Sequence, residues 1–238
     1  MLRALVLLAA LSGSAAAAPF RVVLDAGHGG SNTGSPGIVE GVYEKRFTLA
    51  LTRRVAEKLA AHPGIEVVMT RTGDRYLSLR ERVRLANRAG GDLFLSLHAN
   101  ASPGGNQRGH ETWILTPEAL TVDARAMRHG DGPARSVDSA LAALLDDLER
   151  GAAAAPSARL AALVDGRLTD VWGPGTSRGV RQGAMDVLIG LTMPGALVEV
   201  GFFDHPEDGP RLLTHDTREK LADALVRAIL DFRASSSF

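Results

Sequence analysis

The chain has 238 residues, with 27 basic and 27 acidic side chains and a formal net charge of zero. At roughly 100–200 residues per domain, this length fits one domain or a small pair. The balanced charge argues against a broad basic surface for nucleic acid, and the 45% apolar fraction argues against a disordered chain. The absence of cysteine excludes disulfide scaffolds, thiol nucleophiles and cysteine metal ligands. Any metal site must therefore use histidine and carboxylate.

Residues 1–18 have the layout of a secretory signal peptide. Arg3 supplies a positive charge, residues 4–11 form an apolar core, and residues 15–18 are the small side chains typical of a cleavage zone. This apolar run is too short to cross a bilayer, and the competing interpretation is a buried N-terminal helix. We therefore expect a soluble mature chain, residues 19–238, in the periplasm or outside the cell, with no membrane span.

The mature chain alternates between short apolar runs and helical periodicities. Strands are predicted at 20–25, 65–70, 92–97, 110–115 and 196–200, and helices at 43–62, 77–88 and 216–232. In the helix at 77–88 we expect Leu79 and Val83 to face the core. Strands that alternate with helices predict an α/β domain with a mainly parallel sheet.

Residues 116–177 depart from this alternation. Apolar residues at helical spacing predict one amphipathic helix there, and a second helix begins near Pro156. The apolar residues of the first helix are Leu141, Leu144, Leu145 and Leu148. We interpret this range as a helical insertion on the α/β core.

Three polar side chains stand where an α/β sheet binds its ligands. His28 follows the first predicted strand, His98 ends the third, and Glu199 lies in the strand ALVEVGF. Ligands of open α/β sheets bind outside the carboxyl ends of the strands, so these side chains are expected to converge on one crevice.

Glu44 falls on the apolar stripe of its helix, one turn before Phe47. A carboxylate that faces the core is costly unless it is paired, protonated or bound to a metal. With His28 and His98 it would make the two-histidine, one-carboxylate set that holds catalytic zinc with an open fourth position. Glu199 would then act as the general base and acid.

Each of these residues also has an ordinary interpretation. The histidines are often simple hydrogen-bonded residues, Glu44 suits the first turn of a helix, and Glu199 suits an ion pair with arginine. His110 and Glu111 begin a strand and are candidates to hydrogen-bond to the metal ligands and orient them. The Gly-rich loop after residue 26 matches neither the dinucleotide fingerprint nor the Walker pattern, and G-x-S-x-G is absent.

Taken in order, the motifs resemble the zinc-dependent N-acetylmuramoyl-L-alanine amidases, the cell-wall amidases of the Amidase_3 type. The motifs are LDAGHGG at 24–30, Glu44 in YEK, Thr70-Arg71 with Asp74, FLSLHAN at 94–100, Arg178-Gly179-Val180 and LVEVGF at 197–202. The resemblance implies a twisted, mostly parallel sheet of about six strands flanked by helices. It also implies Zn²⁺ held by His28, Glu44 and His98, with Glu199 as the catalytic acid and base. The reaction would be hydrolysis of the amide between N-acetylmuramic acid and L-alanine in peptidoglycan.

The sequence departs from the family pattern at three places. Ala26 stands where proline is usual, Asp204-His205 replaces Ser-Asn, and the range 116–177 is longer than in minimal autolysins. That range resembles the segment of division amidases in which a helix covers the zinc until an activator protein displaces it. Autoinhibition is therefore one hypothesis for it, and simple packing on the core is the other.

Two further functions compete with the amidase. One is a zinc peptidase that uses the same site on another peptide, and the other is a catalytically inactive module that binds the cell wall. A module without activity would be expected to lack at least one of His28, Glu44, His98 and Glu199, and all four are present. We expect a monomer with no separate wall-binding domain.

Overall fold

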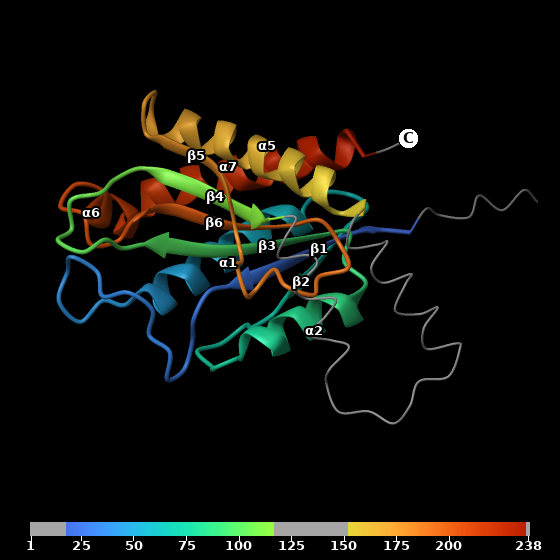
Figure 1. The fold of residues 1–238 in the computed structure, drawn as a ribbon, viewed down its shortest axis with the longest axis horizontal. Helices are drawn as coiled ribbons and strands as arrows, with labels where there is room; N and C mark the ends of the chain where they lie inside the picture. Colours follow the sequence, from blue (N-terminus) through green and yellow to red (C-terminus); the bar gives the residue numbers. More distant parts are fainter. Residues whose placement is uncertain (1–17, 117–151, 237–238) are drawn as a thin grey trace, which may run out of the picture.

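The computed structural model describes residues 18–116 and 152–236 and has a six-stranded sheet at its centre (Figure 1). The strands are β1 (Phe20–Ala26), β2 (Ile65–Met69), β3 (Leu93–Asn100), β4 (His110–Leu115), β5 (Ser177–Gly183) and β6 (Gly195–Phe202). Their order is β2-β1-β3-β6-β4-β5, and only the β4–β6 pair is antiparallel. The prediction of a mostly parallel sheet in an α/β fold is confirmed.

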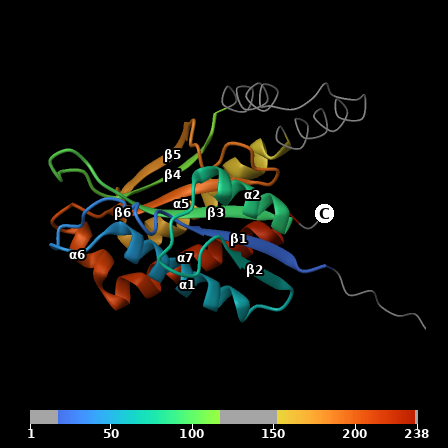
Figure 2. The same ribbon diagram turned by 90° about the horizontal axis from the view of Figure 1, so that it is seen from below.

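Helices cover both faces of this sheet. They are α1 (Glu44–Ala60), α2 (Leu79–Ala89), α5 (Ala154–Trp172), α6 (Asp208–Leu213) and α7 (His215–Ala234). Figure 2 shows α1 and α7 on one side of the sheet and α2 on the other. The main hydrophobic core joins α1, α5 and α7 to the sheet through fully buried side chains such as Leu51, Val164 and Leu225. A smaller cluster, which includes Val83 and Phe94, lies under α2.

The alternation of side chains along β3 and β6 decides which residues share the face covered by α2. Leu95 and Leu97 of β3 belong to the main core, whereas Phe94 belongs to the cluster under α2. Because successive side chains of a strand point to opposite faces, His98 lies on the same face as Phe94. By the same argument Glu199 lies on the same face as Leu197. The polar ends of these strands therefore emerge together on the α2 face.

The ends of α2 are set by residues with clear roles. Ser78 caps the N-terminus in a reciprocal capping box with Glu81, and Gly90 ends the helix in the left-handed conformation with φ of 61°. Val83 is buried as predicted, but the prediction for Leu79 is wrong, since its side chain is 46% exposed. Leu77, just before the cap, is buried in its place.

The range 116–177 divides into two parts. Residues 117–151, with the predicted helix around Leu141 to Leu148, lie outside the described residues. The later part contains α5, which packs Leu160, Val164 and Leu168 into the main core, so the structure places this helix within the α/β layers. No helix among the described residues is long and apolar enough to cross a membrane.

Candidate metal centre

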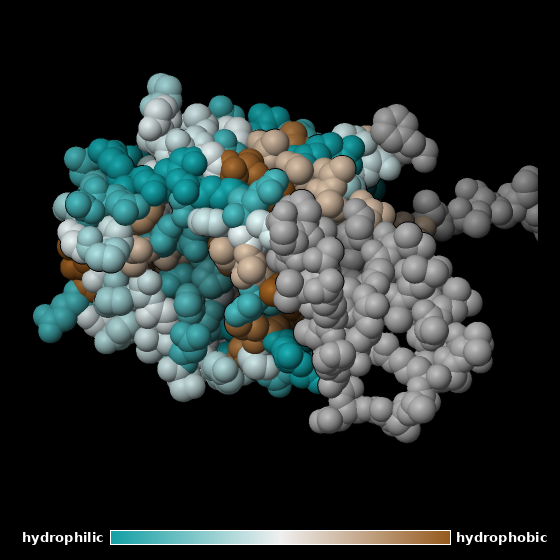
Figure 3. Space-filling model, in the orientation of Figure 1, coloured by the Kyte–Doolittle hydropathy of each residue, from teal (hydrophilic) through white to brown (hydrophobic). Residues whose placement is uncertain are grey.

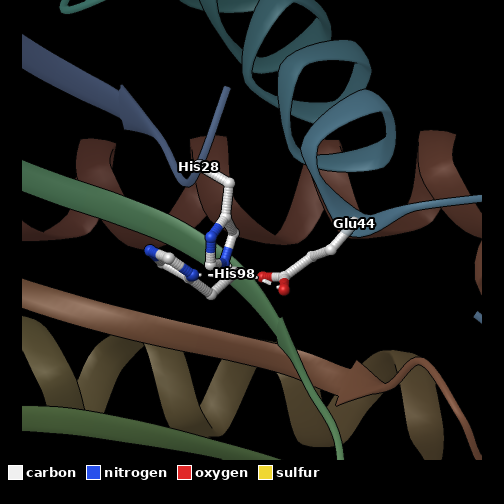
Figure 4. A group of neighbouring side chains, drawn as sticks. All are labelled: His28, Glu44 and His98. Atoms are coloured by element: carbon white, nitrogen blue, oxygen red, sulfur yellow. Dashed lines mark hydrogen bonds and ion pairs between the residues drawn. The ribbon is translucent and has the colours of Figure 1, made fainter. Parts of the chain in front are cut away.

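Three of the predicted site residues meet in one cluster. His28 comes from the loop after β1, Glu44 from the first turn of α1 and His98 from β3 (Figure 4). His28 Nε2 lies 2.9 Å from Glu44 Oε2, and His98 Nδ1 lies 3.1 Å from Glu44 Oε1. The two imidazole rings meet edge to face with their centres 4.8 Å apart. The structure thus brings together side chains that are 16 to 70 positions apart in sequence.

The carboxylate of Glu44 is buried and fully engaged. Besides the two imidazoles it accepts hydrogen bonds from the backbone N–H of Ser35, at 2.9 Å, and of Ala99, at 3.0 Å. Burial alone would raise the pKa of Glu44, but the hydrogen bonds from His28 and His98 outweigh it and hold the pKa below its ordinary value. Glu44 is therefore an anion at neutral pH.

The loop that carries His28 is held in an unusual conformation. His28 has φ of 59°, which makes it the one non-glycine residue with positive φ in the described ranges. Its Nδ1 lies 2.9 Å from Asn32 Oδ1, so Asn32 accepts a hydrogen bond from it and orients the ring with Nε2 toward Glu44. The backbone also needs glycine nearby, because a Cβ on Gly34, where φ is 69°, would lie 2.6 Å from Glu44 Oε2.

Two buried arginines fix this loop through its carbonyl groups. Arg71 donates to the carbonyl oxygens of Ala26, at 2.9 Å, and Gly27, at 2.7 Å. Arg82 of α2 donates to Ala26 and His28, both at 2.7 Å. Arg71 belongs to the Thr70-Arg71 motif, but the sequence by itself assigns no role to either arginine. In the local sequence each arginine is only a charged residue next to apolar ones, and this pattern does not predict that its guanidinium group is buried.

The charge of Arg82 is balanced by Asp25, which is also completely buried. Their side chains form a salt bridge of 2.7 Å, and Asp25 further accepts hydrogen bonds from Thr70 and Ser96. Buried charges are tolerated when they are paired and hydrogen-bonded in this way. One polar network therefore links the end of β1, the His28 loop and α2, beneath the cluster of His28, Glu44 and His98.

Glu199 lies next to the cluster on the neighbouring strand. It is the register partner of His98 in the parallel β3–β6 pair, and both side chains are on the α2 face. Burial raises the pKa of Glu199 to about 7, and the charges of Glu44 and Glu111 add to the effect while His98 opposes it. Its buried Oε2 has no hydrogen-bond partner among the described residues. A carboxyl group in this setting is able to exchange a proton near neutral pH.

The arrangement of donors fits a bound metal ion. One ligand atom from each of His28, Glu44 and His98 lies within 4.8 Å of the others. Two ligand atoms on a tetrahedral zinc ion are separated by roughly 3.3 Å, which is close to the contacts observed here. Two imidazole nitrogens and a carboxylate oxygen form a donor set suited to Zn²⁺. The Gly-rich loop packs against these side chains: a Cβ on Gly27 would lie 2.3 Å from the His98 ring, which leaves no cradle for a phosphate there.

Comparison with known proteins agrees with this geometry. Residues 22–231 match the N-acetylmuramoyl-L-alanine amidase family, Amidase_3. The chain belongs to this amidase family. It is 31% identical over 220 residues to the N-acetylmuramoyl-L-alanine amidase AmiA of Escherichia coli, a match that covers 89% of this chain and 75% of AmiA.

Solved amidase structures share the fold. The N-acetylmuramoyl-L-alanine amidase of Clostridium difficile 630 is 27% identical, with a TM-score of 0.72 and coverage of 92% of this chain and 99% of that one. The amidase AmiC2 of Nostoc punctiforme is 28% identical, with a TM-score of 0.69 and coverage of 90% and 97%. These matches span nearly the whole described domain of the present amidase.

The departure at positions 204 and 205 of this amidase has a structural role. Asp204 Oδ2 accepts a hydrogen bond from the backbone N–H of Ser102, at 2.8 Å. His205 Nδ1 accepts from the backbone N–H of Glu207 and Asp208, at 3.2 and 3.3 Å, where α6 begins. The pair therefore joins the loop after β3 to α6, on the rim beside β6.

His110 and Glu111, the predicted supporting residues, separate onto opposite faces of the sheet. His110 is completely buried and lies 3.2 Å from the backbone oxygen of Asp165, on the side covered by α5. Glu111 lies on the α2 face, directly opposite Glu199 in the β4–β6 register. Glu111 is therefore beside the site, whereas His110 is a core residue.

Proposed function

We propose that this amidase hydrolyses the amide bond between N-acetylmuramic acid and L-alanine of peptidoglycan in a zinc-dependent reaction. The observation that carries the proposal is the cluster of His28, Glu44 and His98 with Glu199 on the adjacent strand, in a chain of the amidase family. A zinc ion at this cluster would polarise the scissile carbonyl and lower the pKa of a water molecule beside it.

Some residues of the chain would bind that ion, and others would hold those ligands in position. His28 and His98 offer ring nitrogens, and Glu44 offers a carboxylate that two backbone N–H groups already orient. Asn32 fixes the ring of His28, and the buried Arg71 and Arg82 fix its loop. Because these contacts exist within the protein itself, the ligands are pre-organised, which favours tight and geometrically defined metal binding.

Glu199 is proposed as the proton carrier. With a pKa raised to about 7, it is able to accept a proton from the attacking water and then donate it to the leaving amine of L-alanine. Its position next to His98 keeps it beside the ligand set. Its own environment, partly buried and with one unpartnered oxygen, raises its basicity above that of an ordinary carboxylate.

A digest of purified peptidoglycan tests this proposal. The mature protein is incubated with the wall material, with and without a metal chelator, and the products are read by mass spectrometry. We expect free stem peptides that begin with L-alanine, and we expect chelation to abolish them. Cleavage at another bond would replace the amidase by a zinc peptidase. Binding without any product, from a metal-loaded protein, would leave an autoinhibited enzyme or an inactive wall-binding module, and deletion of about residues 118–138 would decide between them.

Export and regulation are proposed on the sequence alone. The signal-like segment at residues 1–18 supports a periplasmic or secreted location, which N-terminal sequencing of the protein from culture fractions would test. For residues 116–177 we propose autoinhibition relieved by an activator protein. Deletion of about residues 118–138 should then raise activity on isolated wall, and unchanged or lower activity would exclude it.

A further inference from the structure

Two arginines on β5 lie beside Glu111 and do not belong to the cluster of candidate metal ligands. Arg178 and Arg181 are three positions apart, so in a regular strand they would point to opposite faces. The register of the β4–β5 pair shifts between His110 and Thr112, and this shift places two β5 residues opposite Glu111. Gly179, with φ of 86°, supplies the unusual backbone of such a bulge. The irregularity lets both arginine side chains reach the same face of the sheet.

Both guanidinium groups approach one oxygen of Glu111. Arg178 Nε donates to Glu111 Oε2 at 2.8 Å, and Arg181 Nε lies 3.0 Å from the same atom. The other oxygen of Glu111 accepts from two neutral donors, Asn100 Nδ2 at 2.8 Å and Trp113 Nε1 at 3.1 Å. One buried carboxylate therefore faces two guanidinium groups, and the group of residues keeps an excess of one positive charge.

The outer edges of the arginines remain available to a ligand. Their side chains are 29% and 40% exposed, whereas that of Glu111 is 6% exposed. Arg178 Nη2 donates to Gln107 Oε1 at 2.8 Å, whereas Arg181 approaches Glu111 as an ion pair and its Nε makes no hydrogen bond to the described residues. A guanidinium whose Nε edge faces Glu111 still presents two parallel N–H donors at its other edge, which is the geometry that binds a carboxylate with two hydrogen bonds.

The position of this pair relates it to the candidate catalytic site. Glu111 is opposite Glu199, which is in turn the register partner of His98. Neighbouring strands lie about 4.8 Å apart, so β5 is two strand spacings, roughly 10 Å, from Glu199. An extended peptide covers this distance in about three residues. Figure 3, which views the molecule from the α2 face, shows mostly hydrophilic side chains over the end of the sheet where β1 and β3 finish.

We propose that Arg178 and Arg181 bind a free carboxylate of the stem peptide next to the scissile amide, and so determine which stem peptides the enzyme accepts. The inference rests on the proposed function. The stem residue that follows L-alanine is D-glutamate, whose α-carboxylate is free in some walls and a carboxamide in others. It is the first carboxylate beyond the cleaved bond. Two extended residues span about 7 Å, and both arginine side chains reach from β5 to Glu111 on β4, which shortens the distance that the peptide must cover. Neutralisation of Glu111 would need only one arginine, so the second arginine favours an anionic ligand over a purely structural role.

Two defined substrates test the proposal. One is a muramyl tripeptide with D-glutamate, and the other is the same compound with D-isoglutamine, in which the α-carboxylate is an amide. The zinc-loaded protein is compared with Arg181→Gln and Arg181→Lys by kcat and KM on each compound. Arg211→Gln is the matched control, because Arg211 stacks on Trp172 at 4.5 Å as Arg181 does on Trp113 at 5.7 Å.

We expect the wild type to prefer the carboxylate compound by about tenfold in kcat/KM, mainly through KM. Arg181→Gln should remove this preference by lowering activity on the carboxylate compound alone. Arg181→Lys should restore part of it, because lysine keeps the charge and loses the two-pronged geometry. Arg211→Gln should keep the wild-type preference. Equal loss on both compounds in Arg181→Gln, or no preference in the wild type, would overturn the inference.

A binding measurement separates this inference from the proposed function. If neither the wild type nor the variant that lacks about residues 118–138 hydrolyses either compound, the proposed function has failed and the affinity decides the inference. Calorimetric titration of both compounds into the same proteins should give a Kd about tenfold weaker for the carboxylate compound in Arg181→Gln. The same Kd in both proteins would refute carboxylate binding by the pair.

Discussion

Glu199 of β6 and Glu111 of β4 are directly opposite each other in the antiparallel register of the sheet. Two carboxylates in this arrangement repel each other, and the charge of Glu111 contributes to the raised pKa of Glu199. Arg178 and Arg181 form salt bridges with Glu111. The pKa of Glu199 is therefore affected by a neighbour that itself lies outside the His28, Glu44 and His98 cluster.

This relationship predicts a pH effect. If Glu199 must be ionised to accept a proton, kcat/KM rises with pH through the pKa of Glu199, and this rise is the acidic limb of the pH profile. The positive charge of a bound zinc ion lowers that pKa, so the limb is expected below pH 7. Glu111→Gln removes a negative charge, lowers the pKa of Glu199 and moves the acidic limb to lower pH. The profile is measured on a small muramyl peptide between pH 4 and 9. Glu66→Gln, on the distant strand β2, should leave the limb in place, and an unmoved limb in Glu111→Gln would refute the coupling.

Glycine at position 34 is predicted to be required for metal binding. In Gly34→Ala the left-handed backbone of the alanine costs about 1–2 kcal/mol of stability. The added Cβ would also lie 2.6 Å from the Glu44 carboxylate. Gly41→Ala is the matched control, since Gly41 has φ of 76° with no atom within 4 Å of the added Cβ. Both variants should lose stability from the left-handed backbone, and Gly34→Ala should lose more because of its contact with Glu44. Only Gly34→Ala should weaken zinc affinity, by tenfold or more in competition with a chromophoric chelator.

Removal of Arg82 is predicted to destabilise the whole domain. Arg82→Met leaves Asp25 buried without its ion-pair partner and removes donors from the carbonyls of Ala26 and His28. Loss of one partner from a buried pair costs about 3–5 kcal/mol. Urea unfolding of the metal-free protein measures this, so that zinc binding does not contribute. Arg84→Met, at an exposed position of the same helix, should change the free energy of unfolding by less than about 0.5 kcal/mol.

The sequence allowed the positions of the candidate ligands to be anticipated, because each rests on a local pattern. The positions of His28 and His98 are predicted from the ends of strands, and that of Glu44 is predicted from helical periodicity. The structure brings these three side chains together. Their roles as ligands, and that of Glu199 in proton transfer, stay predictions until a metal and a product are measured.

Other features depend on contacts that no local pattern encodes. The strand β5, with the sequence SRGVRQG, lacks apolar alternation because it is an edge strand with a bulge and partly exposed side chains. The burial of Arg82 requires Asp25, 57 positions away. The burial of Arg71 requires the carbonyls of Gly27, in the loop after β1, and of Lys45, in the first turn of α1. Such residues appear as ordinary surface charges until the tertiary fold supplies their partners.

Ion pairs between α1 and α7 predict a second, separate pH dependence, this time of stability. Arg54 lies 2.6 Å from Glu219, and Lys58 lies 3.2 Å from the same residue. The hydrogen bond from Arg54 lowers the pKa of Glu219 from 4.5 to about 2, against a smaller opposing effect of burial. Because the folded pKa is the lower one, this contribution is complete above pH 4.5 and is lost as the pH falls toward 2.

The test compares the melting temperatures of the wild type and Glu219→Gln from pH 7 to pH 2. Since these side chains are partly exposed, we expect the wild type to melt only about 2 °C or less above the variant at pH 7. The difference should shrink between pH 4.5 and pH 2, and 1 M salt should reduce it at pH 7 by screening. Asp216→Asn, whose partner Lys220 is on the same helix and well exposed, should show a smaller difference. A difference for Glu219→Gln that stays constant down to pH 2 would show that the ionised carboxylate is not what joins the two helices.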